Sequence, residues 1–183
     1  MQKIISLLLF LTVITVNNIS NADSGVTGSI GAGAIQIGAG QPQFAITPSA
    51  AWHSDHDWYR FSLSESVNIL GALGGAHQIG TGLGINAHTV ASAGAFGDSF
   101  AVDAGVSLAA YYMGACSSLR CGGVGGMAPE LSVKGEWYNG WLANSVGLSA
   151  VATLGYYGGH SLVLPGGPVA MVAFGPIFRT GSR

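Results

Sequence analysis

The sequence predicts an all-β fold, an eight-stranded antiparallel up-and-down (meander) transmembrane β-barrel, and three observations carry this prediction. Long segments alternate strictly between apolar and polar residues, which is the period of a β-strand with one apolar face. Only 8% of the 183 residues are charged, whereas a soluble domain has about a quarter. The chain also contains 30 glycines, and each glycine in a helix interior costs about 1 kcal/mol.

The N-terminus has the features of a signal peptide. An apolar run at 4–16 follows Lys3, and small residues allow cleavage after Ala22. We expect residues 1–22 to be removed and residues 23–183 to form a single β-barrel domain. A retained membrane anchor is the alternative, but the run is shorter than the roughly 18 apolar residues that a spanning helix needs.

Eight segments in which apolar and polar residues alternate follow the predicted signal peptide. The alternation is weak in the first of them and clearer in the next three. The first, around SIGAGAIQIGAG, is weak because glycine and alanine fill most positions. The second, FAITPSAAWH, and the third, WYRFSLSESVNIL, place apolar residues at every other position, with Glu65 as the exception. The fourth, QIGTGLGINAH, sets isoleucine and leucine against glycine, asparagine and histidine.

In the second half of the chain, single charges enter the polar faces. They occur in the fifth segment, SFAVDAGVSLAAYY, and in the sixth, MAPELSVKGEWY. The seventh, WLANSVGLSAVATLGYY, sets leucine and valine against serine and threonine, and the eighth, PVAMVAFGPIFR, is weaker. The predicted strands are 27–37, 44–53, 58–70, 77–89, 99–112, 127–138, 141–156 and 169–179. Several exceed the usual five or six residues and suit a tilted bilayer crossing of about 9–11.

The connections and the aromatic residues indicate two different ends. Short turns are predicted at SDHD (54–57) and at Asn139–Gly140, a strong two-residue hairpin signal, and long loops at 113–126 and 157–168. The predicted aromatic girdle has Trp52, Trp58, Trp137 and Trp141 beside the short turns, and Tyr112 and Tyr156 at the other end. Short turns opposite long loops, with aromatic girdles at both interfaces, are typical of outer-membrane barrels.

On this pattern, residues 27–179 resemble the small eight-stranded outer-membrane barrels of Gram-negative bacteria, the OmpA/OmpX type. The resemblance implies a place in the bacterial outer membrane, with the lipid bilayer as a partner. Two positions depart from the pattern. The last aromatic residue, Phe178, lies five residues before the end of the chain, whereas the family usually ends on one. Glu65 falls on an apolar face, where it costs about 2 kcal/mol at mid-membrane unless a bulge near Ser64 turns it inward.

Six charged residues fall on the polar faces of the predicted strands: Arg60, Asp103, Glu130, Lys134, Glu136 and Arg179. An eight-stranded barrel is just wide enough for side chains to fill it, and an unpaired buried ion costs several kcal/mol. We therefore expect an interior charge network that fills the lumen. The alternative is a narrow, low-conductance pore in which Arg60 and Lys134 select ions.

Two further groups of residues could bind metal or form a covalent link. Cys116 and Cys121 lie in a Gly/Ser-rich stretch of an exported chain, which favours a small disulfide loop over two free thiols. The stretch His53-Ser54-Asp55-His56-Asp57 could supply metal ligands, but its residues are also ordinary turn residues. We favour the polar turn, and we expect no metal and no cofactor.

The sequence predicts a structural or surface-interaction role rather than an enzyme, because no motif places a nucleophile beside a base. An extracellular partner could bind the loops 113–126 and 157–168. The net charge of −2 does not indicate a nucleic-acid partner. The alternative from another class is a secreted lipocalin-like barrel that binds an apolar ligand, with the apolar faces inside.

Overall fold

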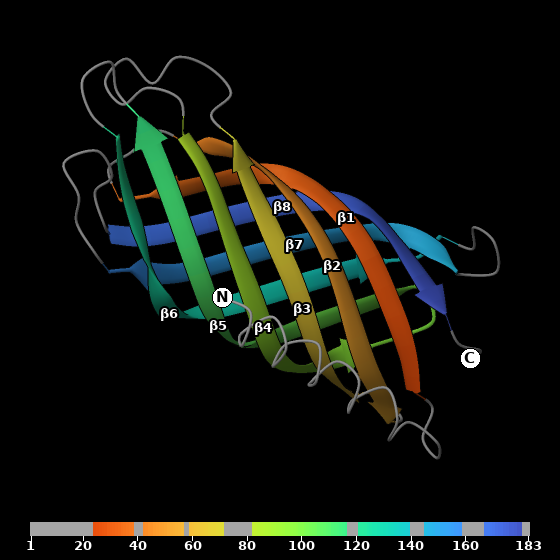
Figure 1. Cartoon of the computed structure of the whole chain (residues 1–183). Coiled ribbons are helices and arrows are strands. Elements are labelled where there is room, and N and C mark those ends of the chain that lie inside the picture. The colour runs from red at the N-terminus through yellow and green to blue at the C-terminus, as the bar shows by residue number, and fades with distance from the viewer. Residues whose placement is uncertain are drawn as a thin grey trace.

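The computed structural model is a closed barrel of eight antiparallel strands in sequence order, which confirms the predicted fold class (Figure 1). It describes residues 24–38, 42–56, 59–71, 82–116, 121–139, 145–158 and 167–180, so the predicted signal peptide lies outside the described residues. In those residues, no helix is long and apolar enough to cross a membrane. The strands are β1 (Ser24–Ile37), β2 (Gln43–His56), β3 (Tyr59–Gly71), β4 (Gly82–Phe96), β5 (Phe100–Cys116), β6 (Cys121–Trp137), β7 (Val146–Tyr157) and β8 (Gly167–Thr180).

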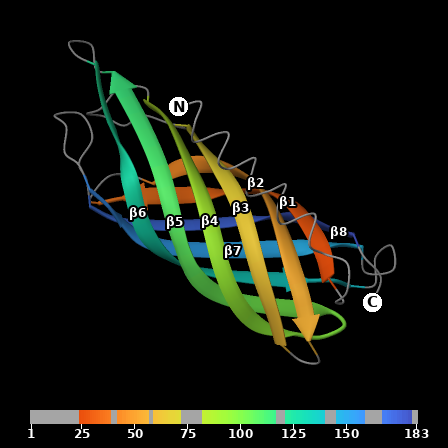
Figure 2. The same ribbon diagram turned by 60° about the horizontal axis from the view of Figure 1, so that its bottom comes forward.

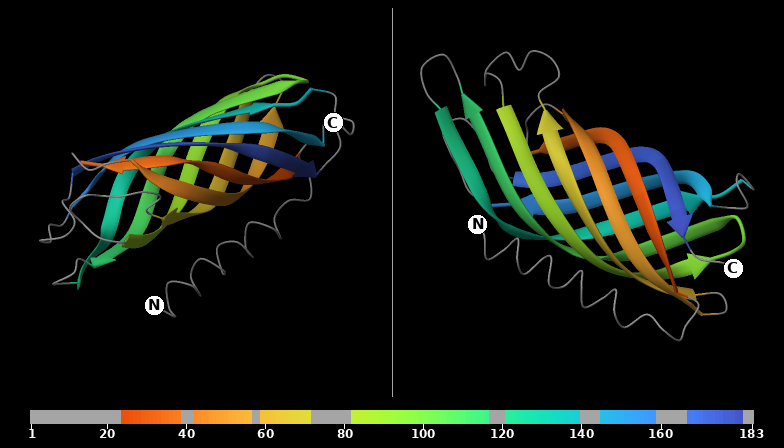
Figure 3. Two further views of the ribbon diagram at one scale, coloured as in Figure 1. Left: turned by 90° about the horizontal axis from the view of Figure 1, so that it is seen from above. Right: turned by 45° about the vertical axis from the view of Figure 1, so that its right-hand side comes forward.

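The barrel closes where β1 pairs with β8, and its strands are staggered. The pairing can be followed around the wall from Val26 of β1 until it returns to β1 at Gln36, ten residues further along (36 − 26 = 10). The path is Val26, Trp52, Leu63, Ala91, Val106, Leu131, Leu154, Ala170, Gln36. A closed sheet needs such a stagger, and it tilts the strands as Figure 3 shows. We call the end where β1 begins and β8 ends the termini end, and the opposite end the loop end.

The apolar side chains face outward and the polar ones inward. Val106, Leu131 and Phe174 are each more than 60% exposed, while Arg60 and Asn68 are 1% exposed or less. The interpretation as a lipocalin-like barrel, which needs an apolar lumen and a polar surface, is therefore wrong.

The hairpin of β5 and β6 is longer than the sequence predicted. The loop expected at 113–126 is wrong, because the pairing continues to Cys116 opposite Cys121 and leaves only residues 117–120 between the strands. Figure 2 shows this hairpin reaching beyond the neighbouring strands at the loop end. The sequence did not predict the first residues of β6, because glycines at 122, 123, 125 and 126 interrupt the alternation of apolar residues. Glycine still pairs through its backbone, so the strand forms.

The two-residue turn at Asn139–Gly140 is also wrong, because Trp137 pairs with Leu148 and the connection is longer. The Tyr138 N–H donates to the Ser99 carbonyl at 2.8 Å, and the Tyr138 side chain is 1% exposed. The chain therefore continues past Trp137 before it reverses. The residues predicted to begin the seventh strand, 141–144, lie outside the described residues.

The bounds of β4 and β2 also differ from the prediction. The fourth strand, predicted at 77–89, is found at Gly82–Phe96, because its alanine-rich continuation shows little alternation. The stretch 54–57 is not a four-residue turn, since β2 continues through His56.

The pairing of β3 with β2 and β4 keeps one register past Glu65, so no bulge turns this residue inward.

Interior glycines allow neighbouring backbones to approach closely. A Cβ atom added at Gly175 of β8 would lie 2.0 Å from the Ile30 carbonyl oxygen of β1, at the seam that closes the barrel. A Cβ added at Gly135 of β6 would meet nothing within 4 Å.

We predict that Gly175→Ala lowers the free energy of unfolding by about 1–3 kcal/mol, because β1 and β8 must separate to admit the methyl group. Gly135→Ala is the matched control, and we expect it to be neutral or to raise stability by about 0.4–1 kcal/mol. Urea unfolding from lipid vesicles measures both. Equal stability of the two variants would contradict the tight seam.

The disulfide remains a prediction, because the structure does not describe the side chains of Cys116 and Cys121. Their backbone positions are directly paired, and directly opposed residues have Cβ atoms close to the separation that a disulfide needs. We expect the unreduced protein to be lighter by two hydrogen atoms than the reduced protein and to resist alkylation. Alkylation of both thiols without prior reduction would show that they are free.

Candidate functional site

The lumen holds the candidate site, and its charged side chains gather near the termini end. Asp55 of β2 is at the centre of the first group. Its Oδ1 atom lies 2.8 Å from the Arg60 Nε atom and 3.1 Å from His53 Nδ1, and its Oδ2 atom lies 3.0 Å from Arg179 Nη2. Three side chains from β2, β3 and β8 thus converge on one carboxylate.

Glu136 of β6 is the centre of the second group. Its carboxylate accepts from Arg60 Nη1 at 3.0 Å, from Lys134 Nζ at 2.8 Å and from the Tyr138 hydroxyl at 3.1 Å. Burial and the Glu136 charge raise the pKa of Tyr138, which follows β6, so its phenol stays protonated and can donate this hydrogen bond.

Arg60 joins the two groups into what we call the lumen network: Asp55, Arg60, Lys134, Glu136 and Arg179. Its guanidinium is 1% exposed, bonds both carboxylates and lies over the Phe96 ring at 5.4 Å. The planar guanidinium is suited to this role, because it presents several donors in fixed directions. The network carries three positive and two negative side chains.

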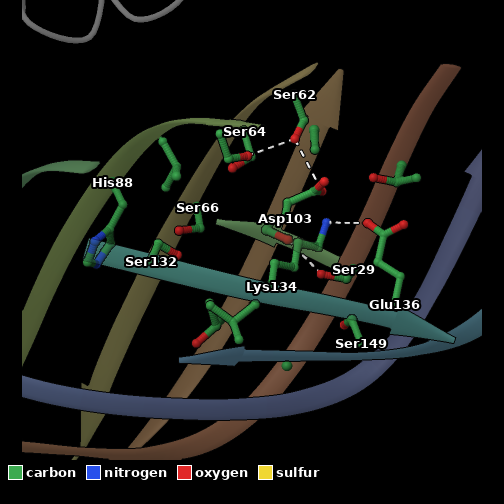
Figure 4. Close-up of a pocket in the computed structure, with 18 of the residues that line it drawn as sticks. Ser29, Ser62, Ser64, Ser66, His88, Asp103, Ser132, Lys134, Glu136 and Ser149 are labelled. Atoms are coloured by element: carbon green, nitrogen blue, oxygen red, sulfur yellow. Dashed lines mark hydrogen bonds and ion pairs between the residues drawn. The ribbon is translucent and has the colours of Figure 1, made fainter. Parts of the chain in front are cut away.

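Asp103 supplies the balancing negative charge beside the network. It is 2% exposed and directly opposite Lys134 in the β5–β6 pairing. Its Oδ2 atom accepts from the Ser62 hydroxyl at 3.2 Å (Figure 4). The Ser62 hydroxyl oxygen is also 2.8 Å from that of Ser92. The formal charges of Asp103 and the five side chains of the network, three positive and three negative, sum to zero.

A separate polar layer lies closer to the loop end. His88 Nδ1 is 2.6 Å from Glu130 Oε2, and its Nε2 atom is 2.6 Å from Asn68 Nδ2. Ser107 donates to the same Glu130 oxygen at 3.4 Å. A catalytic triad would need the serine on His88 Nε2, but here Asn68 holds that atom and the serine contacts the carboxylate.

A serine-lined cavity of about 40 Å³ separates the two polar layers. Figure 4 shows His88 on one side of it and Asp103, Lys134 and Glu136 on the other. Among the described residues, four buried lining atoms have no hydrogen-bond partner: Thr27 Oγ1, Thr47 Oγ1, His53 Nε2 and Asp103 Oδ1. A water needs about 10–15 Å³ of such space, so the cavity has room for a few waters that can bond these atoms.

Apolar side chains occupy the lumen at the loop end. Tyr111 and Tyr157 stack with ring centroids 4.1 Å apart and planes 3° from parallel, and the Tyr111 hydroxyl donates to the Gly158 carbonyl. We call this group the tyrosine plug, and its members are Ile35, Ile37, Ala45, Ala109, Tyr111, Ala128, Tyr157, Val169 and Met171. Met171 of the plug also lines the cavity, so the plug borders the cavity on the side of the loop end.

The structure places the predicted charged residues in two places. Arg60, Lys134, Glu136 and Arg179 meet in the lumen network with Asp103 beside them, whereas Glu130 lies apart with His88. The sequence analysis considered Asp55 only as a turn residue or metal ligand and missed its ion pairs with Arg60 and Arg179 in the lumen. Extending the alternation of β2 by two residues past His53 would have placed Asp55 on the inward face.

The predicted metal stretch and the aromatic girdle are described in part. His53 and Asp55 bond within the lumen, while the His56 side chain and Asp57 lie outside the described part of the chain. Across the described ranges, no three His, Cys, Asp or Glu side chains are grouped to hold a metal ion. Trp137, Tyr112 and Tyr156 are exposed on the outer face, and Trp52 is half-buried there. Trp58 and Trp141 are not described.

Fold and lumen together define a closed, side-chain-filled eight-stranded barrel of the kind found among small outer-membrane proteins. No protein-family model matches the sequence, and no curated protein matches it. Among solved structures, the chain is similar to Ail, the attachment invasion locus protein of Yersinia pestis. The TM-score is 0.59 at 8% identity, over 88% of this chain and 100% of Ail.

Two other barrels are similar to a comparable degree. Neisserial surface protein A (NspA) has a TM-score of 0.53 at 10% identity, over 86% of this chain and 97% of NspA. The N-terminal β-barrel domain of Pseudomonas aeruginosa OprF has a TM-score of 0.51 at 12% identity, over 88% of this chain and 100% of the domain. At these identities the likeness shows the fold.

We predict that Arg60→Met lowers the free energy of unfolding by about 3–5 kcal/mol, because Asp55 and Glu136 lose the cation that they share. Thr47→Val is the control, since it removes a buried hydroxyl without a protein partner and should cost less than about 1.5 kcal/mol. Urea unfolding from lipid vesicles measures both. A cost for Arg60→Met no larger than that of the control would show that the lumen network adds little stability.

Proposed function

We propose that this chain is an integral protein of the bacterial outer membrane, a closed scaffold with a structural or surface-interaction role. The observation that carries the proposal is the inverted distribution of side chains. The outer wall is a band of exposed Val, Leu, Ile and Phe with Trp137 near one end and Tyr112 and Tyr156 near the other. A band of this kind is stable in lipid and would aggregate in water.

The filled lumen supports a scaffold rather than a pore. The lumen network lies across the barrel at the termini end, and the tyrosine plug packs inside the described wall at the loop end. An ion would have to separate the paired charges and then pass an apolar layer, and both steps oppose conduction. The narrow pore selected by Arg60 and Lys134 is therefore the second candidate.

The ends of the barrel support an orientation. The signal peptide predicted at 1–22 would deliver the chain to the periplasm, with the termini end on the periplasmic side and the loop end outside the cell. The β5–β6 hairpin and the segment 157–168 would then meet extracellular partners. The name of Ail refers to attachment and that of NspA to the surface, which is in keeping with such a role.

The first experiment is gel mobility of the outer-membrane fraction in SDS, with heated and unheated samples compared. We expect the protein in that fraction, with a band that shifts on boiling, because a closed barrel resists SDS until it is heated. A soluble protein with no shift would contradict the proposal.

Conductance in planar bilayers separates the scaffold from the pore. We expect no steady channel currents from protein that shows the heat-dependent shift. Currents that change ion preference in Arg60→Gln or Lys134→Gln would favour the pore instead.

A further inference from the structure

The backbone pairing of the wall is interrupted in two places, and both lie beside the β1–β2 hairpin. The β1–β8 register omits Ile30 and Gly31, and the β2–β3 register omits Thr47 and Pro48. The other pairings of the described strands omit no position between their first and last pairs. Since β1 and β2 lie between β8 and β3 (Figure 1), this hairpin has one gap along each of its edges.

A proline lies at each gap. Continuing the registers across the gaps places Pro176 opposite Ile30 and Pro48 opposite Val67. Ile30 and Pro48 are themselves paired between β1 and β2, so the four residues follow one row of the pairing across four strands. Proline has no N–H group. The carbonyl groups of Ile30 and Val67 therefore lose the hydrogen bond that any other residue could donate to them.

The gaps lie in the part of the wall that faces outward. The side chains of Ile30, Pro48, Val67 and Pro176 are all exposed on the outer face, and acyl chains offer no donor that could replace the missing N–H groups. Separating the strands at the gaps breaks fewer hydrogen bonds than separating them anywhere else. It also brings the two carbonyl groups within reach of water in the lumen, which can donate to them.

The β1–β2 hairpin is held to the rest of the barrel at its two ends. Asp55 anchors it in the lumen network, and three of its residues belong to the tyrosine plug: Ile35, Ile37 and Ala45. Between these ends its inward residues are small and line the cavity: Ser29, Gly31, Thr47 and Ser49. The Ser29 and Ser49 hydroxyl oxygens are 2.6 Å apart, so this contact joins the hairpin to itself and not to β8 or β3.

We propose that the middle of the β1–β2 hairpin, residues 29–32 and 46–49, is a panel of the wall that opens and closes locally along the two proline gaps. The panel separates from β8 and β3, while the lumen network and the tyrosine plug hold the ends of the hairpin. Water in the cavity bonds to the carbonyl groups of Ile30 and Val67 in the open form. Local opening of this kind occurs where few bonds must break. The inference rests on the proposed membrane location, because lipid excludes water from the outer side of the gaps.

The test is hydrogen–deuterium exchange of the purified full-length protein in lipid nanodiscs, followed for each amide by NMR. We expect the panel to exchange about tenfold faster or more than residues 102–110 of β5, after correction for intrinsic rates. This part of β5 is the reference because its pairings with β4 and β6 are both unbroken.

Pro48→Ala and Pro176→Ala each restore an N–H group at one gap. The new group can donate to the carbonyl group of Val67 or of Ile30, so each variant should slow the exchange of the panel by about two- to tenfold. Pro129→Ala is the matched control. It adds an N–H group on β6 beyond the last residue that pairs with β7, and it should leave the exchange of the panel unchanged.

The heat-dependent gel shift, measured on each sample, reports folding separately. A soluble protein without the shift would contradict the membrane proposal, whereas a folded barrel whose panel exchanges as slowly as β5 would overturn the panel alone. Unchanged exchange of the panel in either proline variant, with the shift retained, would show that the missing N–H groups do not control the opening and would overturn the inference as well.

Discussion

The requirement that every backbone N–H and C=O group be bonded within the protein governs this molecule. In the proposed membrane location, lipid tails cannot bond to these groups, so a sheet that crosses the bilayer must close on itself. Here the closure is the pairing of β1 with β8, reached after a stagger of ten residues. The close approach at Gly175 and the inward direction of every second side chain follow from that closed and tilted wall.

Closure also explains the order of side chains within the lumen. Eight strands give an interior just wide enough for side chains to fill, so the inward residues pack against one another. Charges near the termini end are paired by Arg60, hydroxyl groups surround the cavity, and aromatic and aliphatic side chains fill the loop end. Serine and threonine suit the middle because they are small and can bond to water as well as to protein.

The alternation of residues predicted the strand number, the barrel and the faces of its charges, because a period of two is a local property of the backbone. Three features could not be predicted from the sequence and were found only in the structure. The glycines of the β5–β6 hairpin pair through their backbone and leave no apolar pattern to detect. The Asn139–Gly140 signal was overridden by Tyr138, whose buried side chain and Ser99 hydrogen bond continue the strand. Asp55 was assigned to a turn, because the short stretch between Trp52 and Trp58 contains typical turn residues.

The ion pair between Arg179 and Asp55 joins residues 124 positions apart, at 3.0 Å. Arg60 lies in the hairpin that contains Asp55, so that contact can form early, whereas Arg179 arrives only with the last strand. Until then the β2–β3 hairpin carries a carboxylate that lacks one of its two arginine partners. The final strand thus completes both the backbone pairing and the contact between Arg179 and Asp55, and a chain that closes in the wrong register can form backbone bonds but loses that contact. This links the fidelity of assembly to a contact between the second strand and the last.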